Sequence, residues 1–158
     1  MPQLQTKYFG PVTCDPDELF QFPAGLPAFE EEKSFAPLDL PGTEPLLFLQ
    51  STSRPELCFL CFPILVVDPS YKLSVAAEDL DLLELGRDRQ PRIGADVLVL
   101  AFLSIQDNQP ATANLMAPVV VNPKNRRGVQ AIRCDAVYSH QHAIPGLSKE
   151  GVAKEQRC

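Results

Sequence analysis

Prolines occur throughout the chain, and 16 of them in 158 residues is about double the usual proportion of roughly 5%. Proline fixes φ and has no backbone N–H, so it interrupts helices and enters sheets only at strand starts, edges or bulges. Because the prolines are not gathered in one linker, no part of the chain readily accommodates a long helix. The spacing therefore predicts short segments separated by turns.

Between the prolines lie short stretches rich in β-branched, leucyl and aromatic residues, which are typical of strands. Their apolar runs are nearly continuous, which favours burial on both faces or packing near a barrel interior. The polar link 122–127 has the length of a hairpin connection, and residues 136–140 could continue the meander. The expected strands cover residues 46–51, 57–67, 97–105, 113–121 and 128–133.

The segment 76–85 has a different pattern. It carries acidic residues in its first turn, Leu80 and Leu83 three residues apart, and Gly86 at the position of a helix C′ residue. We expect a short helix that covers one end of a sheet. A chain of this length can bury one core. The sequence therefore predicts a mainly β, single-domain antiparallel β-barrel-like fold with one short helix over residues 1–145, followed by a flexible tail over 146–158.

Net charge and hydropathy argue against several classes of protein. The net charge is −6, whereas nucleic-acid binders carry clustered positive charge, so we expect no direct nucleic-acid partner. An acidic surface instead favours encounter with a basic protein. The longest apolar run, 57–67, is shorter than the roughly 20 residues of a membrane span, and residues 1–8 lack a signal-peptide pattern. We therefore expect no membrane partner and a cytoplasmic location.

The chain has five cysteines, an odd number that favours reduced thiols over a disulfide framework. Cys58 and Cys61 form a C-x-x-C pair, which can be redox-active or supply half of a zinc site. On a strand, residues three apart point to opposite faces, so inert core thiols are the favoured interpretation. His140 and His142 could share a metal ion, but a solvated edge is the more usual role. No catalytic residue, metal ligand or cofactor is predicted, because nucleophile and phosphate-loop motifs are absent.

Charged residues cluster in several places. The acidic clusters 15–18, 30–32 and 78–79 do not match a calcium loop and are expected to be solvated. The span 119–133 contains four basic residues and no acid. Such residues either protect a sheet edge from aggregation and keep it soluble, or form a recognition patch. These basic residues are Lys124, Arg126, Arg127 and Arg133.

Several motifs occur together in one order along the chain. They are T-K-Y-F-G at 6–10, F-P-A-G-L-P-A-F-E at 22–30, L-Q-S at 49–51, D-L at 79–80, N-L-M-A-P-V-V-V-N at 114–122 and R-R-G at 126–128. Together they resemble the bacterial flagellar assembly factor FliW family over residues 6–142. The sequence departs from the family at Ala24 and Ala28, which replace an acidic residue and a glycine, and at Ala76, which replaces a helix-capping serine.

The resemblance implies a small, mostly antiparallel β-barrel-like protein without enzymatic activity. It also implies two partners, namely flagellin, bound in the cytoplasm, and the carbon storage regulator CsrA, an RNA-binding translational repressor. After flagellin is exported, the freed factor would bind CsrA and lift repression of flagellin synthesis. Such partner exchange follows from mass action and needs no catalytic group.

Polar motif residues without an evident conformational role are the candidates for partner binding. They are Gln50, Asn114, Asn122, Arg126 and Arg127. Their ordinary role would be turn and edge chemistry. We expect a monomer. Two alternatives remain open: a thiol- or zinc-dependent protein that uses Cys58 and Cys61, and a β-barrel that encloses a small ligand, although the bulky Phe, Leu and Val content predicts a filled interior.

Overall fold

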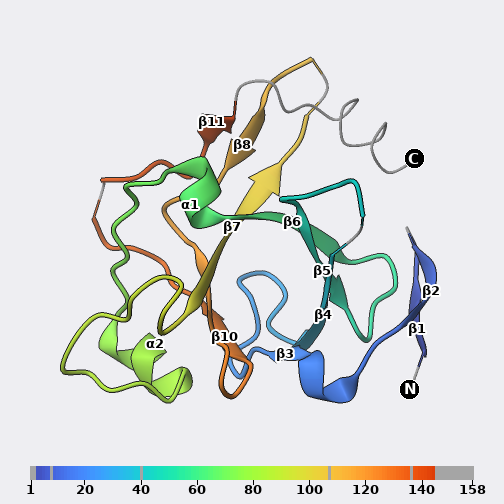
Figure 1. Cartoon of the computed structure of the whole chain (residues 1–158), viewed down its shortest axis with the longest axis horizontal. Helices are drawn as coiled ribbons and strands as arrows, with labels where there is room; N and C mark the ends of the chain where they lie inside the picture. Colours follow the sequence, from blue (N-terminus) through green and yellow to red (C-terminus); the bar gives the residue numbers. More distant parts are fainter. Residues whose placement is uncertain (1–2, 8, 40, 107, 136, 145–158) are drawn as a thin grey trace.

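The computed structural model describes residues 3–7, 9–39, 41–106, 108–135 and 137–144, so the tail expected over 146–158 lies outside the described residues. Strands make up most of the regular structure (Figure 1). They are β1 (Gln3–Thr6), β2 (Gly10–Thr13), β3 (Phe20–Gln21), β4 (Ser34–Leu38), β5 (Leu47–Ser51), β6 (Cys58–Pro63), β7 (Leu98–Ser104), β8 (Ala111–Ala113), β9 (Val119–Asn122), β10 (Arg127–Gln130) and β11 (His142–Ile144). The helices are the 3-10 helix η1 (Pro16–Glu18), α1 (Ile64–Val67) and α2 (Ala77–Leu82).

Seven strands close into a barrel in the order β3, β4, β5, β6, β7, β9, β10 and back to β3. All neighbours are antiparallel except β10 and β3, which run parallel through the pair Arg127 and Gln21. At this junction the Gln21 N–H donates to the Arg126 carbonyl over 2.8 Å. Strands β8 and β11 extend the sheet beyond β7, and β1 and β2 form a separate ribbon. The predicted mainly β, barrel-like fold is therefore confirmed, with one parallel junction where the barrel closes.

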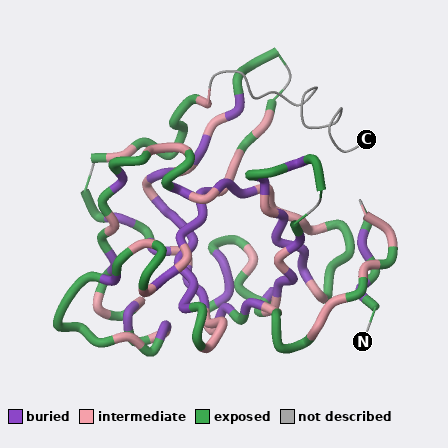
Figure 2. Tube along the Cα trace, viewed as in Figure 1, coloured by how far each residue is buried: buried purple, intermediate pink, exposed green. Residues whose placement is uncertain are grey.

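The barrel interior is filled by side chains from the strands and from the loop between β3 and β4, which we call the plug loop (residues 22–33). The plug loop lies at the centre of the ring of strands (Figure 1), and part of it is buried (Figure 2). Phe22 and Leu26 of this loop are 0% and 1% exposed and pack against Phe35, Leu49 and Leu100. Because these side chains occupy the space where a ligand would lie, the interior is packed as the Phe, Leu and Val content predicts.

The outer face of the barrel is also covered. Val120 of β9 faces outward, in one apolar cluster with Leu80 of α2 and Leu83, the residue that follows the helix. Its neighbours Val119 and Val121 belong to the cluster inside the barrel. A third apolar cluster lies against the β1–β2 ribbon. Since these strands are buried on both faces, their sequences are almost continuously apolar, as predicted.

Two expected strands are interrupted. Residues 57–67 divide into β6 and the single turn of α1, because Pro63 ends the strand and has no N–H to continue the ladder. Residues 113–121 divide into β8 and β9, because the Asn114 side chain accepts two backbone N–H groups and turns the chain between them. Residues 137–140 form no strand, and the meander continues at β11 instead.

Helix α2 lies within the expected segment 76–85, but α1 is a second α-helix that the prediction of one short helix omitted. Ala76 is the N-cap of α2 and makes no side-chain capping bond. The C′ residue is Glu84, with φ 60°, and not Gly86. The Glu84 and Leu85 N–H groups return to carbonyls of the last turn in a Schellman arrangement. No helix in the described ranges is both long and apolar enough to cross a membrane.

Candidate functional site

Two of the five residues predicted to bind a partner, Asn122 and Arg127, lie against the C-terminal end of α2. Asn122 Nδ2 donates to the Leu83 carbonyl over 2.9 Å, and Arg127 Nε donates to the Leu82 carbonyl over 2.7 Å. Asn125 Nδ2 adds a second bond to the Leu83 carbonyl over 3.2 Å. The last carbonyls of a helix have no partner within the helix. The β9–β10 turn therefore caps α2.

Gln50 and Asn114 also have defined structural contacts. Gln50 is fully buried, and its Nε2 lies 3.1 to 3.3 Å from four carbonyl oxygens in residues 51–57. The two N–H groups of this amide donate among these carbonyls and hold the loop between β5 and β6 in one shape. Gln50 Oε1 is buried without a hydrogen-bond partner in the described part of the chain. Asn114 Oδ1 accepts the N–H groups of Met116 and Ala117 over 3.1 and 3.0 Å.

Arg126 differs from the other four because, among the described residues, its side chain forms neither a hydrogen bond nor an ion pair, whereas each of the others has a side-chain hydrogen bond. It lies in the β9–β10 turn with φ 63°, and its Cζ is 5.9 Å from the centroid of the Phe20 ring. Lys124, in the same turn, is exposed and has no ion pair within the described ranges either. Exposed Lys124 and half-buried Arg126 form the basic tip of the hairpin.

Arg133, the fourth cation of the basic span, is buried at 8% exposure and does not belong to a surface patch. Its guanidinium lies over the rings of Tyr71 and Tyr138, with Cζ 5.7 and 4.9 Å from their centroids. It also donates to both carboxylate oxygens of Asp135, over 2.9 and 2.8 Å, and to the Lys72 carbonyl over 2.6 Å. The hydrogen bonds from Arg133 lower the pKa of Asp135. Arg133 thus ties the segment after β10 to the loop before α2.

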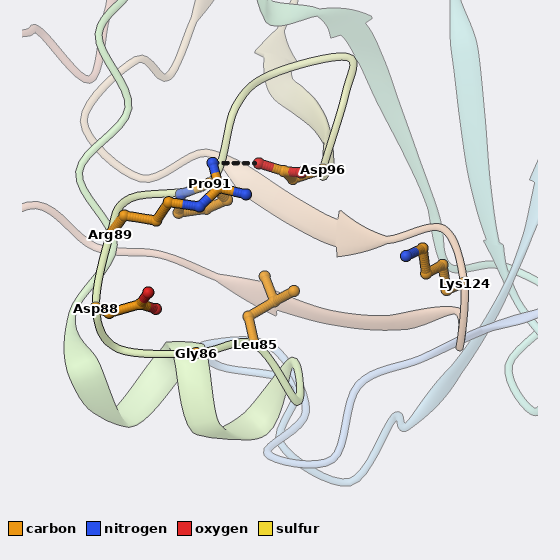
Figure 3. Close-up of a pocket in the computed structure, with 7 residues that line it drawn as sticks. All are labelled: Leu85, Gly86, Asp88, Arg89, Pro91, Asp96 and Lys124. Carbon is orange, nitrogen blue, oxygen red and sulfur yellow. Dashed lines mark ion pairs between the residues drawn. The ribbon is translucent and has the colours of Figure 1, made fainter.

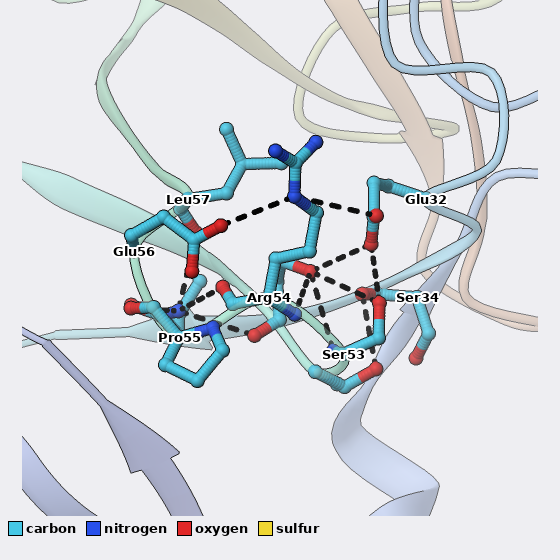
Figure 4. Close-up of polar contacts among 10 residues, drawn as sticks. Glu32, Ser34, Ser53, Arg54, Pro55, Glu56 and Leu57 are labelled. Atoms are coloured by element: carbon cyan, nitrogen blue, oxygen red, sulfur yellow. Dashed lines mark hydrogen bonds and ion pairs between the residues drawn. The ribbon is translucent and has the colours of Figure 1, made fainter.

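Glu32 is a buried carboxylate, although the sequence places it in an acidic cluster that is expected to be solvated. It is 8% exposed and accepts hydrogen bonds from the hydroxyls of Ser51, over 2.9 Å, and Ser53. Figure 4 shows the Arg54 side chain between Glu32 and Glu56, with Nε 3.8 and 3.2 Å from their carboxylate oxygens. This network and the Gln50 side chain hold the exposed β5–β6 loop from both ends.

The C-x-x-C pair lies on two faces of β6, as the strand periodicity predicts. Cys58 packs against the cluster under the β1–β2 ribbon, whereas Cys61 belongs to the barrel interior. Burial raises the pKa of Cys58 to about 12 and raises the pKa of fully buried Cys61 as well. No group of three or more His, Cys, Asp or Glu side chains able to hold a metal ion occurs among the residues that the structure describes.

Three of the cavities on the described surface are of similar size. One, of about 260 Å³, carries both signs of charge: Arg89 pairs with Asp96 over 3.4 Å, and Lys124 lies on the neighbouring β9–β10 turn (Figure 3). A second, of about 260 Å³, is lined mainly by β7 and β8. The third, of about 230 Å³, is lined by the acids Glu30 and Asp79 and by no basic residue. All three are smaller than typical small-molecule sites of about 300 to 1,000 Å³.

The fold and these contacts define a small, closed β-barrel protein with a filled interior and tightly held surface loops. The profile of the FliW protein family matches residues 3–144, so the chain belongs to the FliW family. It is 32% identical over 136 residues to the flagellar assembly factor FliW of Syntrophomonas wolfei, covering 85% of this chain and 83% of that protein. It is 30% identical to the flagellar assembly factor FliW of Bacillus subtilis, covering 92% and 98% of the two chains. A crystal structure of the flagellar assembly factor FliW matches with a TM-score of 0.77 at 30% identity, covering 90% of this chain and 96% of that one. The resemblance seen in the motifs is thereby confirmed.

Proposed function

We propose that the protein is a cytoplasmic, monomeric, non-enzymatic flagellar assembly factor that binds flagellin and antagonises the translational repressor CsrA. The observation that carries this proposal is membership of the FliW family over residues 3–144, among relatives named flagellar assembly factors. Flagellin that accumulates before export occupies the factor. Export of flagellin frees the factor, which then binds CsrA and allows flagellin synthesis to resume.

The charge and chemistry of the chain support a binding role. A net charge of −6 favours encounter with a basic, RNA-binding protein, because complementary potentials raise the association rate. The raised pKa values of Cys58 and Cys61 keep both thiols protonated at neutral pH, so the chemistry of a thiolate nucleophile or zinc ligand has no support at this pair.

Of the five predicted contact residues, Arg126 is the one that we assign to direct contact with a partner. The polar groups of Asn114, Asn122 and Arg127 already hold turns or the end of α2, and Gln50 is buried. These four residues shape the surface that the partner meets. The guanidinium of Arg126 is free to receive a carboxylate from the partner, and such charge-assisted bonds are the stronger ones.

The test is titration calorimetry with flagellin and CsrA from the same genome, first separately and then in competition. We expect both to bind and flagellin to displace CsrA. The variant Arg126→Gly removes the guanidinium at a position where φ is 63°, which glycine adopts without strain. It should weaken binding of one partner by about tenfold or more without lowering the melting temperature. Arg87→Ala, which removes an exposed guanidinium that is paired with Asp81 away from the hairpin tip, is the control for loss of one positive charge.

Failure of the folded wild-type protein to bind either partner would contradict the proposal. Binding of flagellin alone would contradict the proposed antagonism of CsrA and leave an assembly factor that acts only on flagellin. If Arg126→Gly and Arg87→Ala bound both partners as the wild type does, the assignment of Arg126 would be wrong while the proposed function would stand.

A further inference from the structure

We propose that the cavity between the plug loop, α2 and β10 is an anchor pocket for one basic side chain, lysine or arginine, of a protein partner. We call it the acidic pocket. Its walls are residues 24, 25, 27 and 30 of the plug loop, Asp79 and Leu82 of α2, and Val129 and Gln130 of β10. The inference rests on the proposed function in one respect, that the occupant belongs to a protein.

Charge distinguishes this pocket from the other two cavities. Glu30 and Asp79 come from different elements and line one opening of about 230 Å³ that has no basic lining residue. Two basic residues approach the pocket walls without lining the pocket, and a backbone carbonyl holds each: Lys33 Nζ donates to the Pro23 carbonyl over 3.0 Å, and Arg127 Nε donates to the carbonyl of the lining residue Leu82. The cavity beside Arg89, in contrast, contains both signs of charge. The acidic pocket therefore attracts cations.

A cationic occupant would stabilise the ionised form of Asp79. Burial raises its pKa, and the neighbouring Glu78 carboxylate raises it further, so the ionised form of Asp79 is destabilised in the empty pocket. A cation near Asp79 opposes both effects, because opposite charges favour the ionised form. The carboxylate and the incoming cation therefore stabilise each other.

The size and walls of the pocket select a long basic side chain over a small molecule. A volume of about 230 Å³ is below the range of typical small-molecule sites. Pro27, Leu82 and Val129 supply apolar wall, and the two carboxylates supply negative charge. Lysine and arginine combine an apolar stem with a charged end, so they can satisfy both parts of such a pocket. Buried arginine anchors are also enriched among the residues that dominate protein interfaces.

The plug-loop wall of the pocket is fixed before any partner arrives. Gly25 has φ +70°, and a Cβ there would lie 2.4 Å from the Glu30 carbonyl oxygen, so the loop is folded tightly on itself. The Phe29 N–H donates to the Leu26 carbonyl over 2.8 Å and closes the turn. Leu26 is itself buried in the barrel interior. A wall held in this way loses little conformational freedom on binding, which favours affinity.

The probe for this pocket is N-acetyl-arginine amide, titrated into the full-length ¹⁵N-labelled protein and followed by its backbone amide shifts. N-acetyl-citrulline amide, which has nearly the same shape without the charge, is the ligand control. We expect saturable shifts at Gly25, Leu82 and Val129 with the arginine probe only. The double variant E30Q/D79N keeps the shape of the pocket and should bind the arginine probe about tenfold more weakly. Glu31→Gln, at an exposed residue outside the pocket, should bind it like the wild type.

The outcomes separate this inference from the proposed function. Saturable arginine binding that E30Q/D79N loses supports the pocket even if flagellin and CsrA do not bind. The pocket assignment is overturned if the wild type shows no saturable shifts, if citrulline shifts the same amides equally, or if E30Q/D79N binds the arginine probe as the wild type does. Flagellin and CsrA binding could persist in each of these cases, and the proposed function would then stand without the pocket.

Discussion

Burial sets the reactivity of the cysteines. The pKa of Cys58 is raised to about 12 and that of Cys61 is also raised, so neither residue supplies appreciable thiolate at pH 8. In a variant that combines Cys14→Ala, Cys134→Ala and Cys158→Ala, these two thiols should react with Ellman's reagent at least about a hundredfold more slowly than a free thiol with an ordinary pKa of about 8.5. Both should react fully after denaturation. Fast reaction of either thiol in the folded variant would revive the thiol-dependent alternative.

At the scale of the elements, the capping of α2 by the β9–β10 turn predicts that Asn122 contributes to the stability of the fold. Asn122 is 5% exposed, donates to the Leu83 carbonyl and accepts the Lys124 N–H over 3.1 Å. Asn122→Ala should lower the free energy of unfolding by about 1 to 3 kcal/mol, because these buried bonds are lost. The control Asn125→Ala should cost less, because the Asn125 side chain is only half-buried and water can replace part of its hydrogen bonding, whereas Asn122 is buried. Urea unfolding followed by circular dichroism measures both. Full stability with loss of flagellin or CsrA binding would instead make Asn122 a contact residue.

The elements themselves were predictable to the extent that local chemistry determines them. Apolar runs between prolines located five of the seven barrel strands, β5, β6, β7, β9 and β10, but not β3 and β4. The turn made by Asn114 and the end of β6 at Pro63 depend on single residues inside those runs. The contacts of the candidate residues were not predictable, because they join distant parts of the chain. Arg127 meets a carbonyl 45 residues away in sequence, and Glu32 meets Ser51 across 19 residues. No local pattern distinguishes such a buried carboxylate from a solvated one.

For the whole molecule, the closure of the barrel explains why two distant motifs occur together. The parallel junction between β10 and β3 brings the segment 126–128 against the start of the plug loop. Gly128 is buried there, and a Cβ at this position would lie 2.6 Å from Cε1 of the Phe22 ring. Phe22 in turn fills the barrel interior at 0% exposure. The small residue in one motif therefore makes room for the large residue in the other. The contact between Gly128 and Phe22 thus links the strand pairing that closes the barrel to the packing of its interior.

This coupling between Gly128 and Phe22 predicts a non-additive pair of substitutions. Gly128→Ala should lower the free energy of unfolding by about 1 to 3 kcal/mol, because the new methyl group overlaps the Phe22 ring. Phe22→Leu alone should also destabilise the barrel, because it leaves interior space unfilled. In the double variant the smaller leucine admits the methyl group, so its loss should be at least about 1 kcal/mol less than the sum of the single losses. Gly86→Ala is the control, since its Cβ would meet only the side chain of Asp88. Strictly additive losses in urea unfolding would show that the two motifs do not meet as the structure places them.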